Sequence, residues 1–285
     1  MKVLVMPESL DQAKDLINIV DGIIVGIEGL STNMASNFSI SHALLLSDLA
    51  HKNKKEIFIS LNKNMHSSDL GKLEDVMIKL ESYVTGIIYY DMSVLNLKNR
   101  LALKVDLVWN QEHLTTNSLA SDFFYDNGVK YTWISSDITL DEVKEIKENS
   151  KSKLMMMFFG YIPIMVSKRN LISNYKETFK IKDNSNIYYF ELDDNYYPVI
   201  DNKDGTSAFS SSILNGIEES YNLQLDYAIL NSLFIDNTKF KEVAYMFMNM
   251  NEENIKEYKE RIFNMFNTNS GFFYKKTVYK VKKDD

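Results

Sequence analysis

Residues 1–26 read MKVLVMPESLDQAKDLINIVDGIIVG and contain the unit from which the chain is built. Apolar runs at 2–6 and 22–26 are typical of short strands that are buried on both faces. Between them, apolar residues recur at helical spacing, and Ser9 with Gln12 has the spacing of a capping box. The stretch therefore predicts a strand, a helix and a second strand.

The same unit recurs along most of the chain. A second capping box is predicted at Thr139 and Glu142, and Gly128 suits a left-handed helix end. Helices are expected between the strands. Two closing helices are expected after the last strand, at about 238–248 and 252–266. The expected strands are 2–6, 22–26, 56–61, 86–90, 105–109, 131–134, 154–158 and 227–230.

Eight strand–helix units favour an α/β fold of the (β/α)8 TIM-barrel type. An open doubly wound sheet is the competing fold, because periodicity does not show whether a sheet closes. The loop Pro7-Glu8-Ser9-Leu10 contains no glycine, so it lacks the phosphate-binding turn of a dinucleotide-binding domain. The barrel is therefore the preferred prediction.

The alternation of strand and helix patterns stops after Gly160. Residues 168–212 are predicted to form a small antiparallel β insert after strand seven, of two or three strands and without an amphipathic helix. Residues 268–285 form an aromatic and basic segment with β-type alternation, expected to lie on the barrel or beside the insert. No linker is evident, so residues 1–285 are taken as one domain.

Composition excludes several classes of function. The formal net charge of −7 argues against DNA binding by bulk electrostatics, although a local basic groove stays open. The chain has no cysteine, which excludes disulfides, cysteine-ligated clusters and cysteine nucleophiles. No leader and no run long enough to span a membrane are present, so a cytoplasmic protein without membrane contact is expected.

In a barrel of this type, functional groups stand where strands end and loops follow. Asp91 and Asn110 have an alternative explanation as helix caps, because short polar side chains favour such positions. The four histidines match no metal-binding pattern, no serine lies in a nucleophile elbow, and no metal site is predicted. The residues at these positions are Glu8, Glu28, Asn33, Asn62, His66, Asp91, Asn110, Ser135, Asp137, Gly160, Lys168 and Arg169.

The segment from Phe159 to Tyr175 resembles the signature of the U32 peptidase family. With the family glycine on Gly160, residues Ile162, Ile172 and Ser173 fall on matching positions without a gap. Further similarity is found at 197–199, 204–206, 271–274 and 278–282, so the resemblance covers nearly the whole chain and suggests a short, Firmicutes-type member.

The chain departs from the signature at its polar positions. The two signature cysteines fall on Pro163 and Asn170, the glutamate on Met155, the aromatic residue on Met157 and the second glycine on Lys168. Family members are labelled peptidases, some with collagenase activity, and others resemble RNA and quinone hydroxylation factors with a cysteine-bound iron–sulfur cluster. Because the chain has no thiolate, we expect no such cofactor.

The resemblance implies a catalytic or auxiliary factor in hydroxylation of the tRNA wobble uridine, with tRNA and a second U32-family protein as partners. The alternatives are a U32-type peptidase and a non-catalytic barrel that binds a partner through its insert. Catalytic residues stay unassigned. The predicted substrate-binding residues are Lys168 and Arg169 for an anionic group, with Asn62, Asn117 and Asp91 as polar positioning groups. Aromatic residues for stacking and basic residues for phosphate are expected at Tyr175, Tyr188, Tyr189, Tyr274, Lys275, Lys276, Lys280, Lys282 and Lys283.

Overall fold

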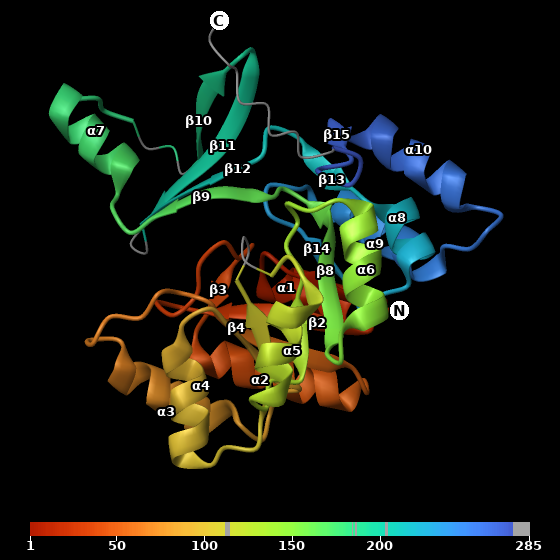
Figure 1. Cartoon of the computed structure of the whole chain (residues 1–285). Coiled ribbons are helices and arrows are strands. Elements are labelled where there is room, and N and C mark those ends of the chain that lie inside the picture. The colour runs from red at the N-terminus through yellow and green to blue at the C-terminus, as the bar shows by residue number, and fades with distance from the viewer. Residues whose placement is uncertain (112–114, 184, 186, 203–204, 276–285) are drawn as a thin grey trace, which may run out of the picture.

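The computed structural model describes residues 1–111, 115–183, 185, 187–202 and 205–275. Its core is a ring of parallel strands surrounded by helices (Figure 1). The strands are β1 (Lys2–Met6), β2 (Gly22–Ile27), β4 (Glu56–Leu61), β5 (Gly86–Tyr89), β6 (Asp106–Asn110), β7 (Tyr131–Trp133), β8 (Lys153–Gly160) and β14 (Tyr227–Asn231). Since β14 pairs with both β1 and β8, the ring closes and the predicted (β/α)8 barrel is confirmed.

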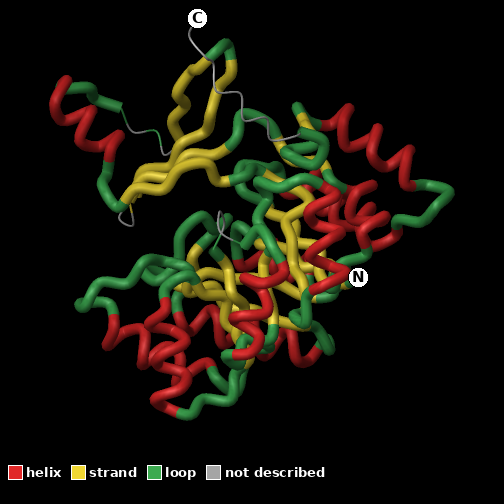
Figure 2. The backbone as a smooth tube through the Cα atoms, in the orientation of Figure 1, coloured by secondary structure: helices red, strands yellow, loops and turns green. Residues whose placement is uncertain are grey.

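Helices pack on the outside of the ring, and Figure 2 shows them around the strands. The predicted Thr139–Glu142 capping box is present, and Gly128 has a φ of 85° after a helix end. Ser9 accepts a hydrogen bond from the Gln12 backbone N–H. The helices are α1 (Leu10–Leu16), α2 (Ile40–Lys52), α3 (Leu70–Leu80), α4 (Met92–Leu101), α5 (Ser118–Asp126), α6 (Leu140–Asn149), α8 (Ile217–Leu223), α9 (Asn237–Asn249) and α10 (Ile255–Met265). None of the helices in the described ranges is both long and apolar enough for a membrane span.

Aromatic side chains fill the amino-terminal end of the barrel. Phe58, Tyr131 and Tyr227 are almost fully buried and meet edge to face, with ring centroids 5.6 to 5.9 Å apart. Burial raises the pKa of Tyr227, and the nearby Glu56 carboxylate adds to the effect. This end is a packed core, so open space is left to the carboxyl end of the strands.

The insert forms a separate antiparallel sheet, in the order β10-β11-β12-β9, beyond the carboxyl end of the barrel (Figure 1). Its elements are β9 (Pro163–Ser167), α7 (Leu171–Phe179), β10 (Ile187–Leu192), β11 (Asn195–Asn202) and β12 (Gly205–Phe209). The chain returns through β13 (Ile213–Asn215), which pairs with β8 and with β15 (Thr268–Asn269), while β3 (Asn37–Phe38) pairs with β2.

Two details of the predicted insert are wrong. The sheet has four strands and begins at Pro163, because β9 pairs with β12 before the chain reaches residue 168. The segment also contains a helix, α7, although none of its residues is buried. Leu171, Tyr175 and Phe179 recur every four residues on this helix, but they form an exposed apolar face instead of packing on a core.

Gly160 stands where the ring closes. It ends β8 with a φ of 127°, a conformation that side-chain-bearing residues rarely adopt. A Cβ atom at this position would lie 2.8 Å from both the Cβ and the carbonyl oxygen of Asn231, at the end of β14. Glycine therefore lets the two strands approach while Asn231 keeps its place.

We expect Gly160→Ala to lower the free energy of unfolding by about 2 kcal/mol or more, through backbone strain and the clash with β14. Urea denaturation followed by circular dichroism measures the change. Gly71→Ala is the matched control, because Gly71 lies in α3 with nothing within 4 Å of an added Cβ. Alanine in that helix should be neutral or stabilising. Equal stability of the two variants would contradict the role of Gly160.

Candidate functional site

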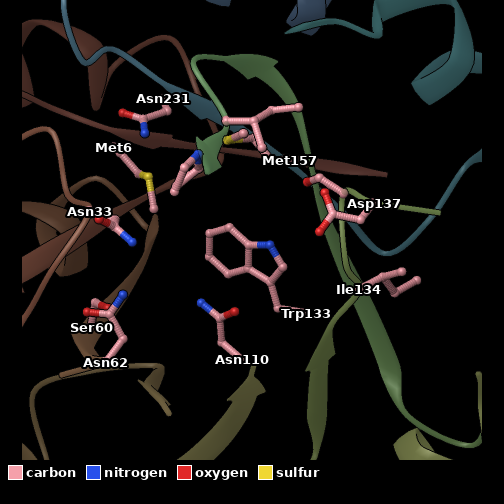
Figure 3. A pocket seen from close by; sticks show the side chains of 13 residues that line it. Met6, Asn33, Ser60, Asn62, Asn110, Trp133, Ile134, Asp137, Met157 and Asn231 are labelled. Atoms are coloured by element: carbon pink, nitrogen blue, oxygen red, sulfur yellow. The ribbon is translucent and has the colours of Figure 1, made fainter. Parts of the chain in front are cut away.

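Two adjoining hollows lie at the carboxyl end of the barrel. The inner chamber has a volume of about 40 Å³, and the outer cleft has a volume of about 420 Å³. Asn33, Asn62 and Asn110 line both, so the chamber communicates with the cleft. The chamber is lined by Met6, Asn33, Ser60, Asn62, Asn110, Trp133, Ile134, Ser136, Asp137, Met157, Ile162, Pro163 and Asn231 (Figure 3).

The chamber is rich in neutral polar groups. Figure 3 shows Asn33, Asn62, Asn110 and Asn231 around the hollow, with the Trp133 indole among them. These side chains come from different strands or from the loops after them, which the barrel brings together in space. Asp137 supplies the one ionisable side chain among the described residues that line the chamber.

Two of the carboxamides hold the frame of the chamber. Asn62 Oδ1 accepts from the Thr32 N–H at 2.9 Å, and its Nδ2 donates to the Thr32 carbonyl at 3.0 Å. Asn231 Oδ1 accepts from the Leu233 N–H at 3.0 Å. These bonds fix the loops after β2 and β14 against the barrel.

The other two carboxamides are unpaired. Asn110 is 4% exposed, and its carboxamide makes no hydrogen bond to any residue that the structure describes. The buried Oδ1 of Asn33 also lacks a partner within the described chain. An unsatisfied buried polar group costs about 1–3 kcal/mol, so it needs an explanation. The interpretation of Asn110 as a helix cap is wrong, because it is the last residue of β6.

The outer cleft combines lysine side chains with an apolar wall. Lys168 Nζ donates to the Asn64 carbonyl at 2.5 Å and lies 3.0 Å from His66 Nε2. Lys63 Nζ donates to the Gly29 carbonyl at 3.1 Å. Ile164, Met165 and Val166 of β9 form the opposite wall. Lys168 thus connects the insert to the barrel rim and places positive charge in the cleft.

The structure brings two of the predicted site residues together, since Lys168 and Asn62 both line the cleft. Asp91 and Asn117 cap α4 and α5 and are not among the cleft residues. Arg169 is exposed beside Lys168, outside both hollows, and its guanidinium has no ion pair within the described ranges.

Asp91 supports the rim of the cleft. Burial of this carboxylate opposes its ionisation. Hydrogen bonds from the Ser93 and Met65 backbone N–H groups, together with the charge of Lys168, nevertheless hold the pKa of Asp91 below its ordinary value. The charged side chain therefore fixes the loop that carries Met65.

Sequence reasoning missed the residues that complete the chamber, notably Trp133, Ser60 and Asn231. Asn231 ends the eighth strand and could have been found by the rule that located Asn110. Trp133 is the last residue of β7, but the strand was expected to run on to Ile134, so the strand-end rule did not reach it. In the described part of the chain, no group of three or more His, Asp or Glu residues could hold a metal ion. His113 and residues 276–285 of the basic segment lie outside the described residues.

Comparison with curated proteins finds relatives along the chain. The tRNA hydroxylation protein P2 of Bacillus subtilis (strain 168) is 25% identical, over 98% of this chain and 99% of the relative. The tRNA hydroxylation protein P1 of the same organism is also 25% identical, over 54% of this chain and 37% of its own length. An uncharacterized protease of Methanocaldococcus jannaschii is 28% identical, over 60% of this chain and 45% of the relative.

Structural comparison shows a shared fold, and a family model matches most of the chain. A solved U32 peptidase, Mk0906, superimposes with a TM-score of 0.52 at 11% identity, over 81% of this chain and 92% of its own, which shows a shared fold. The family model described as "Peptidase family U32" matches residues 8–223. The predicted family is therefore confirmed, and this chain belongs to peptidase family U32.

Proposed function

We propose that this chain is a tRNA hydroxylation protein that binds tRNA at the outer cleft and holds the wobble uridine for hydroxylation. The observation that carries the proposal is the lysine-lined cleft leading into a neutral, carboxamide-lined chamber. The match to tRNA hydroxylation protein P2 along nearly the whole of both chains supports it.

Local charge is what binds the RNA in this proposal. The chain as a whole is acidic, with a formal net charge of −7, so phosphate must be held at a defined position rather than by the general field. Lys168 in the cleft and Arg169 beside it supply cations for the backbone. Asn62, Asp91 and Asn117 act indirectly, by fixing loops and helix ends around the rim.

The side chains that line the chamber, as far as the structure describes them, are better suited to holding a substrate than to transferring protons. Its described lining offers carboxamides, two serines and a single carboxylate, and no histidine. A cysteine-ligated iron–sulfur cluster does not fit this chain, because Pro163 and Asn170 stand at the positions of the signature cysteines. We therefore propose an auxiliary role in which a second U32-family protein takes part in the hydroxylation.

No observation in the chamber favours the peptidase alternative. Peptide hydrolysis needs an activated nucleophile, and a serine is activated by an adjacent general base. Ser60 and Ser136 line the chamber, but none of the other described lining residues is a histidine.

Deletion of the gene tests the function directly. We expect the hydroxylated wobble uridine, measured by mass spectrometry of nucleosides from total tRNA, to be lost or strongly reduced in the deletion strain. A plasmid carrying the wild-type gene should restore it. An unchanged nucleoside profile would remove the proposal.

Salt dependence tests the phosphate contacts. Lys168→Ala and Arg169→Ala should each weaken binding of purified tRNA and reduce the slope of log K against log salt concentration by about 1. Filter binding at several salt concentrations measures both quantities. Lys241→Ala on the exposed surface of α9 is the control, and it should leave the slope unchanged. An Arg169 variant with wild-type binding and wild-type tRNA modification would reject the assignment of that residue.

The partner is tested by copurification. We expect a tagged copy of this chain to retain a second U32-family protein in stoichiometric amount, in contact with the exposed apolar face of α7. Replacing Tyr175 and Phe179 by serine should abolish copurification without lowering the melting temperature, because neither residue is buried. The same exchange at the exposed Phe263 of α10 is the control. Retention of the partner by the α7 variant would contradict this contact.

A further inference from the structure

We propose that strand β10 of the insert is a dimerisation edge, which pairs antiparallel with β10 of a second copy of this chain about a two-fold axis at Tyr189. The observations behind the proposal are the unprotected edge of this strand, its outward-facing main-chain groups and the opposite charges at its two ends. The structure describes all of β10, and none of its residues lines the chamber or the cleft. The dimer contact is therefore separate from the proposed tRNA site.

The two edges of the insert sheet differ in how they are protected. At one edge, β9 begins at Pro163, pairs irregularly with β12 and is followed by Lys168, which is bonded to the barrel rim. Proline, bulges and lysine are common devices that prevent further strand pairing. At the other edge, β10 contains no proline or lysine and pairs with β11 over six residues without a bulge. This edge is therefore open to a further strand.

The main-chain groups of β10 point outward at every second residue. The Ser185 hydroxyl accepts from the Ile187 N–H at 3.3 Å and donates to the Ile187 carbonyl at 2.6 Å, so Ile187 is turned away from β11. Tyr189 lies opposite Pro198 of β11, which has no N–H to donate. Because the direction alternates along an antiparallel pair, Tyr189 and Glu191 also present their N–H and C=O groups at the edge. These groups are available to another strand.

The side chains around this edge are apolar and exposed. Tyr189 is 61% exposed and Leu192 is 55% exposed, and Tyr196 on the neighbouring β11 is 60% exposed. Figure 1 shows that the hairpin of β10 and β11 projects away from the barrel. Exposed apolar clusters of this kind mark interaction surfaces.

The charges at the two ends of β10 favour a second copy of this chain as the occupant. Residues 191–194, at the end of the strand and in the turn after it, carry three acidic side chains and no basic one. Residues 176–183, which precede the strand, carry three lysines and two acidic side chains. Lys176 Nζ lies 3.0 Å from the Tyr188 hydroxyl, which places this basic segment beside the start of β10. Antiparallel pairing about a two-fold axis thus brings the acidic end of each copy to the basic segment of the other.

A register centred on Tyr189 engages the outward-facing groups of both copies. Tyr189 then lies opposite its own counterpart, and aromatic pairs that face each other across two strands are stabilising. Glu191 lies opposite Ile187 of the second copy. The two Glu191 carboxylates are therefore not opposed, and like charges do not disfavour the pairing.

The absence of cysteine makes a crosslinking test specific to this register. The two Tyr189 residues would form a hydrogen-bonded pair with Cα atoms about 5.5 Å apart, which is within the range of a disulfide. We expect Tyr189→Cys to give a dimer on a non-reducing gel after mild oxidation, and dithiothreitol should return it to the monomer. Tyr196→Cys is the matched control, because Tyr196 is equally exposed but lies on β11 and not at the edge, so this variant should stay monomeric.

Sedimentation equilibrium of the purified full chain measures the dimer itself. We expect the mass to rise with concentration from 33.1 kDa towards twice that value, with a dissociation constant on the order of 10 µM, as for other small interfaces. Tyr189→Lys places two like charges opposite each other at the axis and should weaken dimerisation at least about tenfold. Its melting temperature should not change, because the side chain is exposed. Tyr196→Lys is the control and should dimerise as the wild type does.

Three results would overturn the inference: a mass that stays at 33.1 kDa up to about 200 µM, equal crosslinking of the two cysteine variants, or wild-type dimerisation by Tyr189→Lys. A different occupant is also distinguishable. If the purified chain is monomeric but Tyr189→Lys no longer copurifies with a second U32-family protein, the edge binds that protein and the dimer is rejected.

Discussion

Closure of the barrel is the constraint on which the site depends. The last strand, β14, pairs with β1 on one side and with β8 on the other, and Gly160 gives it room to do so. Closure brings the carboxyl ends of strands distant in sequence to one rim. Asn110 and Asn231, from the fifth and eighth barrel strands, thus line the same chamber.

The chamber divides its carboxamides between two tasks. Asn62 and Asn231 are hydrogen-bonded to neighbouring backbone and hold the loops in place. Asn110 and Asn33 have buried oxygens without partners in the described chain, which is unfavourable for the free protein and favourable for a ligand that supplies the missing bonds. The fold thus provides a rigid frame around groups that are prepared for binding.

The barrel could be predicted from the sequence because eight apolar strands with helices between them leave few alternatives. Functional groups in such barrels stand at the carboxyl ends of the strands, and this rule placed Asn110 at the rim. Because asparagine is also a common helix cap, a cap was the simpler explanation of this residue. Trp133 was not assigned because the expected strand ran one residue too far, to Ile134, and only polar residues after the strands were considered. Helix α7 was missed although Leu171, Tyr175 and Phe179 have helical spacing, because the surrounding β-type pattern dominated the segment.

The pairing of Asn62 with Thr32 has a consequence for how such barrels diversify. Both ends of this amide are engaged by main-chain atoms, so the loop geometry does not depend on the identity of the Thr32 side chain. The Asn110 side chain carries no part of that scaffold, whereas the φ of 56° at Asn33 favours asparagine or glycine at that position. Exchange of the Asn110 side chain therefore alters the lining of the cavity while the hydrogen bonds between Asn62 and Thr32 stay in place.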